Sequence, residues 1–470
     1  MDLESDSIPR LHSFAWNLGI RSEPHEQLAD ITTMLNWADV QRLSRTYFTV
    51  VRPDVGHIDE AEYMEAATAR YTKATGNHDI DAVMLGVAAL GSFFSSDPHP
   101  SEADFVKHAY SSLREHSIQR SPTFNNVSAW ILRTLYQRLT TRPHTAWISS
   151  CITMHQAEAS GLHKELQTIA VVYPAVPVGD HKVAKTRRRL FWVARTLNVI
   201  LSFEYGRSPV TFDVVTTKRP AAESGTHVHQ FIELAELLPS DVTDNEREPD
   251  PPAALATALT RIEDMQSDSS FINTLRADLA FGIYRRLWLM SLTDAKDRAE
   301  SIMAVGKAAL EASARLLEAR IPWSNMISAP FQFLCVVLAA GTPKSLAFVG
   351  DIMRQLHAIA QIYDTHMVRE AYNQALSLVN MAKKRKEKEI NALNLVDHTA
   401  PLDGPVPHTT ASSGTSEPPP EIDWASVDIP YDWNWDAFLN PSLIMSASQA
   451  QPVADGAYDA RPYMAEGPWR

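Results

Sequence analysis

Residues 185–209 have the sequence KTRRRLFWVARTLNVILSFEYGRSP, and the interpretation of the whole chain starts from them. The apolar residues in this stretch recur at helical spacing: Leu190, Val193, Ala194, Leu197, Ile200 and Leu201. This spacing puts one continuous apolar stripe on an α-helix. Gly206 then suits a positive φ, and Pro209 prevents the helix from continuing. The stretch therefore predicts a buried amphipathic helix.

Three consecutive arginines, Arg187, Arg188 and Arg189, begin the predicted helix. They would give it a cationic first turn, which is unusual because the helix dipole favours anions at the N-terminus. We therefore expect these arginines to pair with carboxylates elsewhere in the fold, or else to face an anionic partner.

Helical periodicity continues on both sides of this stretch, and strand signals are few. Asp59 and Asn126 are the expected N-caps of two helices, and Gly161 is the expected residue just past the end of another. Pro330 is expected to lie in a turn before an apolar helix. The pattern predicts an all-α body.

Composition divides the 470-residue chain into three parts. Residues 1–39 form an N-terminal extension, residues 40–395 form the helical body, and residues 396–470 form a tail. Within the body, the acidic and Pro-rich residues 238–253 predict a loop that divides two helical halves. The tail is rich in proline and acidic residues and is expected to be disordered, because it cannot bury enough apolar surface to offset its chain entropy.

The formal net charge of −13 is concentrated in that tail, which from residue 396 onward has 11 acidic residues and 2 basic ones. The body is close to neutral, and so it does not match DNA, which requires clustered Lys and Arg. Cys151 and Cys335 are expected to be buried free thiols in a reducing compartment. Neither a signal peptide nor a membrane span is expected, so we expect a soluble intracellular protein.

Acidic and aromatic residues alternate in residues 421–442 of the tail, EIDWASVDIPYDWNWDAFLNPS. Acidic residues keep aromatic side chains solvated and available for a hydrophobic groove on a partner. This composition predicts an activation segment that binds the transcription machinery or a coactivator. The alternative is that these aromatics dock back on the same protein. The residues assigned to the segment are Trp424, Asp432, Trp433, Trp435, Asp436, Phe438 and Leu439.

A run of mixed charge, KKRKEKE, occupies residues 383–389. One interpretation is a solvated helix end, where cations are favourable. The other is a nuclear localisation signal made of Lys383, Lys384, Arg385 and Lys386. The two interpretations are compatible with each other.

Motifs for catalysis are missing from the chain: there is no G-x-G-x-x-G, no phosphate-binding loop, no H-E-x-x-H and no G-x-S-x-G. His155 and His163 lie eight residues apart without a suitably placed third metal ligand. The acidic clusters at residues 241–246 and 294–297 do not form the magnesium-binding array of a helical cyclase. We therefore expect neither an enzyme nor a metal site.

The stretch at residues 185–209 resembles the signature of the fungal-specific transcription factor domain, the regulatory middle region of fungal zinc-cluster transcription factors. The signature residues are Gly161, Leu162, His163, Arg187, Arg188, Arg189, Phe191, Trp192, Gly206, Arg207 and Pro209. The resemblance covers roughly residues 40–388. Two departures are Asn198, where the family commonly has Asp, and Ser208, which is inserted before Pro209.

The resemblance implies a nuclear transcription regulator of a metabolic or secondary-metabolite pathway, with a homodimer or a small-molecule effector as further partners. A complete zinc-cluster regulator has six cysteines that bind two zinc ions, and two distant cysteines cannot form that module. We therefore expect no cofactor in this chain, no membrane partner, and contact with DNA only indirectly or through a separate N-terminal module. The alternative is a small-molecule-sensing or scaffold protein on the same fold.

Overall fold

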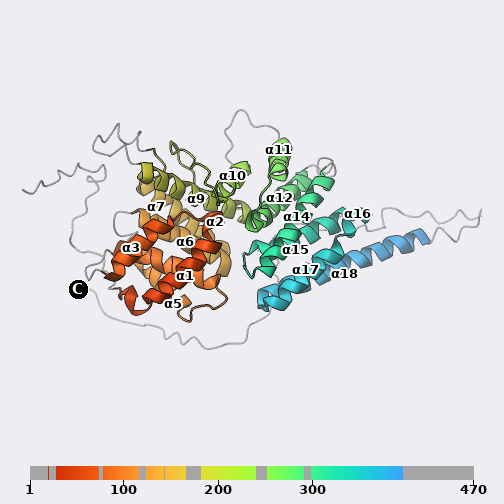
Figure 1. The fold of residues 1–470 in the computed structure, drawn as a ribbon. Helices are drawn as coiled ribbons and strands as arrows, with labels where there is room; N and C mark the ends of the chain where they lie inside the picture. Colours follow the sequence, from red (N-terminus) through yellow and green to blue (C-terminus); the bar gives the residue numbers. More distant parts are fainter. Residues whose placement is uncertain are drawn as a thin grey trace, which may run out of the picture. The chain divides into compact units, whose positions relative to one another are not determined.

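The computed structural model describes residue 20 and residues 28–72, 78–115, 123–141, 143–165, 181–239, 251–290 and 298–394. Every regular element within these ranges is a helix (Figure 1), so the all-α class is confirmed for them. The chain divides into two compact units, Met1–Asn373 and Gln374–Arg470. The predicted tail, residues 396–470, lies outside the described residues, and the boundaries at residues 40 and 395 stay predictions.

The first half of unit Met1–Asn373 is a series of helices that pack on their neighbours. Helix α1 packs on α4, α4 packs on α5 and α6, α6 packs on α7, and α7 packs on α9. Their bounds are η2 Ile31–Thr33, α1 Trp37–Val50, α2 Arg52–Val55, α3 Glu60–Thr72, η3 His78–Ile80, α4 Asp81–Phe93, α5 Glu102–Leu113, α6 Phe124–Thr140, α7 Pro143–Ala159 and α9 His181–Tyr205.

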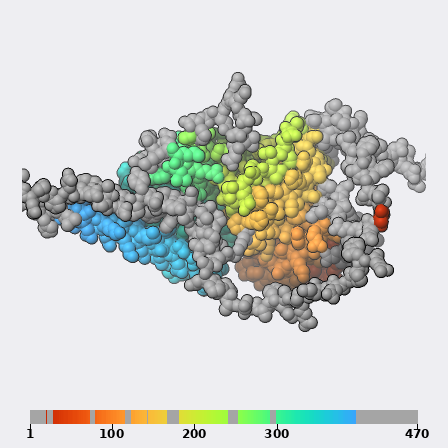
Figure 2. Space-filling view, turned by 180° about the vertical axis from the view of Figure 1, so that it is seen from behind, coloured from red at the N-terminus to blue at the C-terminus, as the bar shows by residue number. Residues whose placement is uncertain are grey.

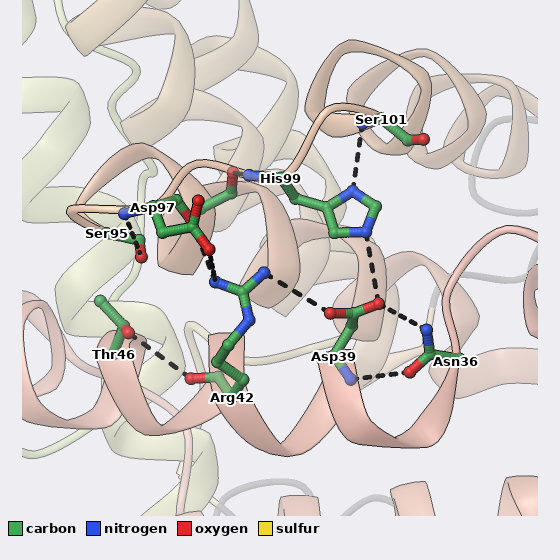
Figure 3. A network of polar contacts seen from close by, with 9 residues as sticks. Asn36, Asp39, Arg42, Thr46, Ser95, Asp97, His99 and Ser101 are labelled. Atoms are coloured by element: carbon green, nitrogen blue, oxygen red, sulfur yellow. Dashed lines mark hydrogen bonds and ion pairs between the residues drawn. The ribbon is translucent and has the colours of Figure 1, made fainter.

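A polar network fixes the start of α1 against the loop between α4 and α5 (Figure 3). Asn36 caps α1 by accepting a hydrogen bond from the Asp39 backbone N–H at 2.9 Å. The Asp39 carboxylate lies 3.3 Å from Nε2 of His99 in that loop. Arg42 donates to the Asp97 carbonyl oxygen at 2.9 Å. One side-chain cluster therefore satisfies both a helix terminus and the backbone of a neighbouring loop.

The second half of the same unit is built around α12, in which every residue from Phe271 to Tyr284 is buried. Helix α12 packs on α11, α14 and α15, and α15 packs on α17. The bounds are α10 Val228–Leu237, α11 Pro251–Asp264, α12 Ser270–Met290, α14 Ala299–Glu318, α15 Asn325–Ala340, α16 Pro343–Leu346 and α17 Val349–Ile362. Helix α18, His366–Asn394, continues from this unit into the second one.

Helix α2 joins the two halves. The Pro53 carbonyl oxygen accepts a hydrogen bond from the His227 backbone N–H at 2.6 Å, just before α10. The Asp54 carboxylate accepts one from the Ser269 hydroxyl at 2.7 Å, just before α12. The expected loop at residues 238–253 separates α10 from α11 along the chain. Its residues 240–250 lie outside the described residues, and α11 already begins at Pro251.

Two local expectations were wrong. Asn126 does not cap α6, because the Thr123 side chain caps this helix by accepting a hydrogen bond from the Asn126 backbone N–H. Pro330 does not lie in a turn but inside α15. A proline there leaves the Met326 carbonyl oxygen, four residues earlier, without its helical donor. The buried Ser313 hydroxyl of α14 donates to that oxygen at 2.6 Å, and this bond compensates for the missing backbone donor.

Candidate functional site

Helix α9 carries most of the signature residues, and its buried face includes Leu190, Phe191, Val193, Ala194, Leu197, Ile200 and Leu201. The buried amphipathic helix is thereby confirmed. The cationic first turn was wrong, because α9 begins at His181, six residues before Arg187. The dipole effect falls off within the first turn, so the arginines do not meet the penalty expected for them.

Gly161 and Gly206 end α7 and α9 in the same way. Each has a positive φ, of 65° and 60° respectively. The next residue donates back across the turn, Leu162 to the Ala157 carbonyl oxygen at 2.9 Å and Arg207 to the Ser202 carbonyl oxygen at 2.8 Å. These bonds satisfy carbonyl groups at the helix ends that would otherwise have no donor. The expected glycine terminations are therefore confirmed.

The turn after Gly161 pairs with a non-helical segment far along the chain. The His163 carbonyl oxygen accepts hydrogen bonds from the backbone N–H groups of Thr216 and Thr217 at 3.0 and 3.2 Å. The Thr217 hydroxyl donates to the Leu162 carbonyl oxygen at 2.7 Å. Residues 161–165 and 216–218 therefore lie side by side, and we call this pair of segments the cradle.

The three arginines of α9 hold the cradle and the chain beyond it. Buried Arg187 donates to the Gly161 and Lys164 carbonyl oxygens. Arg188 pairs with Glu165, its Nε donating at 2.7 Å. Arg189 pairs with Glu223. The expectation of carboxylate partners inside the fold is thus met for Arg188 and Arg189, whereas Arg187 binds backbone carbonyl groups instead.

The electrostatics of these pairs favour the charged forms of both carboxylates. Burial alone would raise the pKa of Glu165, but hydrogen bonds from Arg188 and from the Lys218 backbone N–H outweigh it and lower that pKa. Burial acts in the same way on Glu223, and Lys185 and Arg189 lower its pKa below the ordinary value. Lys185 lies 2.9 Å from the Glu223 carboxylate.

Aromatic residues complete the contacts between α9 and the cradle. Phe191 is fully buried, with its ring 6.3 Å from that of Phe212. The His163 ring also packs against Phe212, at 5.4 Å between centroids. Trp192 donates its indole N–H to the Lys218 carbonyl oxygen at 2.9 Å. The two aromatic residues of the signature therefore have different roles. Phe191 packs in the core, and Trp192 binds the backbone of the cradle through its indole N–H.

Asn198 anchors the turn that follows α9. It is fully buried, donates to the Ser150 hydroxyl of α7 at 2.9 Å, and accepts from the Val210 backbone N–H at 2.7 Å. Arg207 stacks on Trp147, with its guanidinium carbon 4.9 Å from the ring centroid. Pro209 lies next to Val210 in this turn. The Ser150 hydroxyl donates its own proton to the Trp147 carbonyl oxygen at 2.7 Å, so its contact with position 198 requires the side-chain N–H that Asn198 has and an aspartate lacks.

The structure thus brings the whole signature set together around one helix, where its members hold α9, the cradle and the following turn in contact. Arg187, Arg188 and Arg189 are engaged by backbone carbonyl groups or by carboxylates of the same fold, and Arg207 stacks on an indole ring. Within the described residues, no group of three or more His, Cys, Asp and Glu residues could hold a metal ion, and no helix is long and apolar enough to cross a membrane. The buried Nδ1 of His163 has no hydrogen-bond partner in that part of the chain, and burial lowers the pKa of this histidine.

The other predicted residues lie elsewhere. Lys383, Lys384, Arg385 and Lys386 lie in α18 and are exposed. All seven residues of the acidic segment, from Trp424 to Leu439, lie outside the described residues. The sequence interpretation missed Glu165, Glu223 and the segment at residues 216–218. Glu165 lies two residues after the Gly-Leu-His motif, which could have pointed to it, whereas Glu223 has no local signal.

Comparison with known proteins agrees with this geometry. Residues 45–302 match the model of the fungal specific transcription factor domain. Protein RDR1 of Saccharomyces cerevisiae is 36% identical over 405 residues, which cover 85% of this chain and 73% of that protein. Transcription factor kojR of Aspergillus oryzae is 33% identical over 454 residues, which cover 94% of this chain and 80% of that protein.

A more distant relative is the citrinin biosynthesis transcriptional activator mrl3 of Monascus ruber, 23% identical over 187 residues, which cover 38% of this chain and 35% of that protein. No solved structure matches the chain at a significant level. These relatives are transcription factors, which are not enzymes and in general act in the nucleus. Because the domain match covers more than half of the chain, and two relatives exceed 30% identity over most of their length, the chain belongs to the family defined by the fungal specific transcription factor domain.

Proposed function

We propose that this protein is a fungal regulator of transcription for a metabolic or secondary-metabolite pathway. The observation that carries the proposal is the similarity to kojR, a transcription factor, along 94% of the chain. The arrangement around α9 supports it, because the signature arginines hold helices and loops together.

The activating element in this proposal is the segment at residues 421–442, in which Trp433, Trp435 and Phe438 alternate with Asp432 and Asp436. Its partner is the transcription machinery or a coactivator with a hydrophobic groove. Residues 396–470 joined to an unrelated DNA-binding module should activate a reporter gene. The double variant Trp433→Ala with Trp435→Ala should lose most of that activity.

A matched control lies in the same tail. Trp469→Ala removes a tryptophan outside the acidic segment and should leave the reporter signal unchanged. A fusion that gives no activity at a normal protein level would exclude the activating role of the tail. Equal losses for the segment variant and for Trp469→Ala would show that the effect is not specific to the segment.

Nuclear import is assigned in this proposal to Lys383, Lys384, Arg385 and Lys386, because all four side chains are exposed on α18. Alanine at all four positions should shift a fluorescent fusion of the full chain from nucleus to cytoplasm. Lys344→Ala with Arg354→Ala removes two exposed cations elsewhere and serves as the control. Unchanged nuclear signal in the fourfold variant would assign import to another part of the chain.

DNA is reached indirectly, or through a separate N-terminal module, in this proposal. Affinity for DNA comes largely from clustered cations that displace counterions, and the net charge of −13 opposes it. The isolated chain should therefore bind a DNA duplex weakly, with little dependence on salt. Tight binding that weakens steeply between 50 and 200 mM salt would contradict this, because such a slope reports many phosphate contacts.

A second candidate function is the sensing of a small anionic effector, favoured by a feature beside the cradle. Arg195 and Arg219 lie 5.4 and 6.0 Å from the centroid of the Trp192 ring. Arg219 pairs with Glu236, whereas no carboxylate in the described residues pairs with half-buried Arg195. Burial and the neighbouring Arg219 both lower the pKa of Arg195. A panel of carboxylates should raise the melting temperature of the chain but not that of Arg195→Met, and a flat response would exclude this role.

A further inference from the structure

The last part of α18 has no other element packed on it within the part of the chain that the structure describes. Every residue from Lys383 to Asn394 is exposed, three turns of helix in all, and Figure 2 shows side chains of α18, in blue, on the molecular surface. Isolated helices of about this length are only marginally stable in water, because the hydrogen bonds of a few turns do not offset the free-energy cost of helix nucleation. Arg385 and Lys386 both pair with Glu389, but exposed pairs on one helix stabilise it little.

One face of this helix has a regular pattern. Leu376, Val379, Lys383, Lys386, Ile390 and Leu393 follow one another at alternating spacings of three and four residues, and we call them the α18 stripe. Such spacing is typical of a helix face that packs lengthwise against a second helix. Leu376, Ile390 and Leu393 are 39%, 55% and 70% exposed. Large apolar side chains exposed along one face mark an interaction surface.

The two lysines within the stripe restrict what can cover it. In a parallel, in-register pair of two copies of α18, Lys383 and Lys386 would each face their own counterpart, and like charges at such positions destabilise the pair. An acidic, amphipathic partner avoids this cost, since its apolar residues can cover Leu376, Ile390 and Leu393 while its carboxylates meet the lysines. Charge complementarity of this kind fixes register and partner choice.

The same chain provides a segment with this chemistry. Residues 421–439 have five carboxylates and no Lys or Arg: Glu421, Asp423, Asp428, Asp432 and Asp436. Tyr431, Trp435 and Phe438 also follow one another at spacings of four and three residues, and Pro430 and Pro441 flank them. The aromatics of this segment therefore recur at helical spacings like those of the stripe, and Asp432 and Asp436, four residues apart, provide carboxylates for Lys383 and Lys386, which are three residues apart.

The connection between the two elements is long enough. Residues 395–420 can span up to roughly 85 Å when extended, whereas the stripe from Leu376 to Leu393 is about 25 Å long at the rise of an α-helix. Tethering makes the association intramolecular, with an effective concentration in the millimolar range. A contact too weak to form between separate molecules can therefore be populated within one chain.

From these observations we propose that the α18 stripe binds residues 421–439 of the same chain, with Trp435 and Phe438 covering Ile390 and Leu393, and Asp432 and Asp436 meeting Lys383 and Lys386. The contact covers Lys383 and Lys386 together with aromatic residues of the tail, whereas Lys384 and Arg385 lie outside the stripe and stay exposed. It goes beyond the proposed function, because it holds whether or not the segment activates transcription.

Hydrogen–deuterium exchange on the full chain tests the contact. Backbone amides of residues 383–394 should exchange about tenfold faster when Trp435→Ala and Phe438→Ala are combined, because an open helix end loses protection. The tail variants leave the helical body unchanged, so a folding defect cannot imitate the result. Trp469→Ala is the control and should leave exchange of these amides at the wild-type rate.

A charge swap gives the sharper test. Lys383→Glu with Lys386→Glu should speed exchange of residues 390–394, and adding Asp432→Lys with Asp436→Lys should restore protection. Fast exchange of residues 383–394 in the wild-type chain would overturn the proposal. Protection that depends on protein concentration and ignores the tail variants would also overturn it, in favour of a second copy of the chain. The reporter fusion lacks α18, so its outcome is separate from this one.

Discussion

Removal of the Ser313 hydroxyl tests the most unusual contact in the core, the one that accommodates Pro330 inside α15. Ser313 is fully buried and donates to the Met326 carbonyl oxygen at 2.6 Å, at the place where the helical donor is missing. In Ser313→Ala this carbonyl group loses that donor. Leaving a buried acceptor unsatisfied costs about 1–3 kcal/mol, and the better helix propensity of Ala offsets a few tenths of this. We expect the free energy of unfolding to fall by about 1–2 kcal/mol.

The position of Pro330 provides an internal test of this reasoning. In Pro330→Ala the backbone regains an N–H group four residues after Met326, in place to donate to the same oxygen. Ser313→Ala should therefore cost less than half as much in the Pro330→Ala background as in the wild-type background. A double-mutant cycle isolates this coupling from whatever Pro330→Ala does by itself.

Urea unfolding followed by far-UV circular dichroism measures all four proteins, with equal slopes required for a comparison of free energies. Glu311→Ala, an exposed change on the same helix α14, serves as the control and should be within about 0.5 kcal/mol of wild type. Equal losses from Ser313→Ala in both backgrounds would refute the compensation, and so would no loss in either.

Three further predictions concern buried charge and helix ends. Burial raises the pKa of Asp278 to about 7. The free energy of unfolding of the wild type should therefore fall as pH rises from about 4 to about 7. In Asp278→Asn the free energy of unfolding, measured by urea titration, should depend less on pH over this range. The lowered pKa of Glu165 gives the opposite pH dependence. The charged carboxylate stabilises the fold at neutral pH, and this stabilisation is lost as pH falls. Glu165→Gln should therefore lower the free energy of unfolding by about 1–3 kcal/mol at pH 7 but by little near pH 3. Gly206→Ala should destabilise the protein by about 1 kcal/mol because of the positive φ alone, since an added Cβ meets nothing within 4 Å. Gly350 lies inside α17 without a positive φ, so Gly350→Ala should stabilise the protein by about 0.5–1 kcal/mol. Thermal unfolding measures both variants.

Local rules predicted those features that depend on residues near one another in the sequence. The spacing from Leu190 to Leu201 predicted the buried face of α9, and Gly161 and Gly206 were identified as helix ends from their type alone. Asp59 accepts hydrogen bonds from the backbone N–H groups of Ala61 and Glu62, as an N-cap should. Each of these depends on contacts within about five residues, for which sequence patterns are informative.

The same rules failed where a distant group decides the outcome. Pro330 predicted a turn because a proline removes a helical donor, and only the Ser313 hydroxyl on another helix makes the position tolerable. Asn126 and Thr123 are both good caps, and the exact start of α6 decided between them. The dipole argument placed the three arginines too near the N-terminus, because α9 already begins at His181, directly after Asp180 in the sequence.

The sequence by itself determined the helical class, the buried stripe of α9 and the membership of a family. It could say that Arg187, Arg188 and Arg189 needed partners, because cations are costly to bury alone. Only the tertiary structure decided which partners: two carbonyl groups for Arg187, Glu165 for Arg188 and Glu223 for Arg189. The reason is that a long, charged side chain can satisfy itself with any acceptor within reach, and packing alone brings residues 23 or 34 positions apart together.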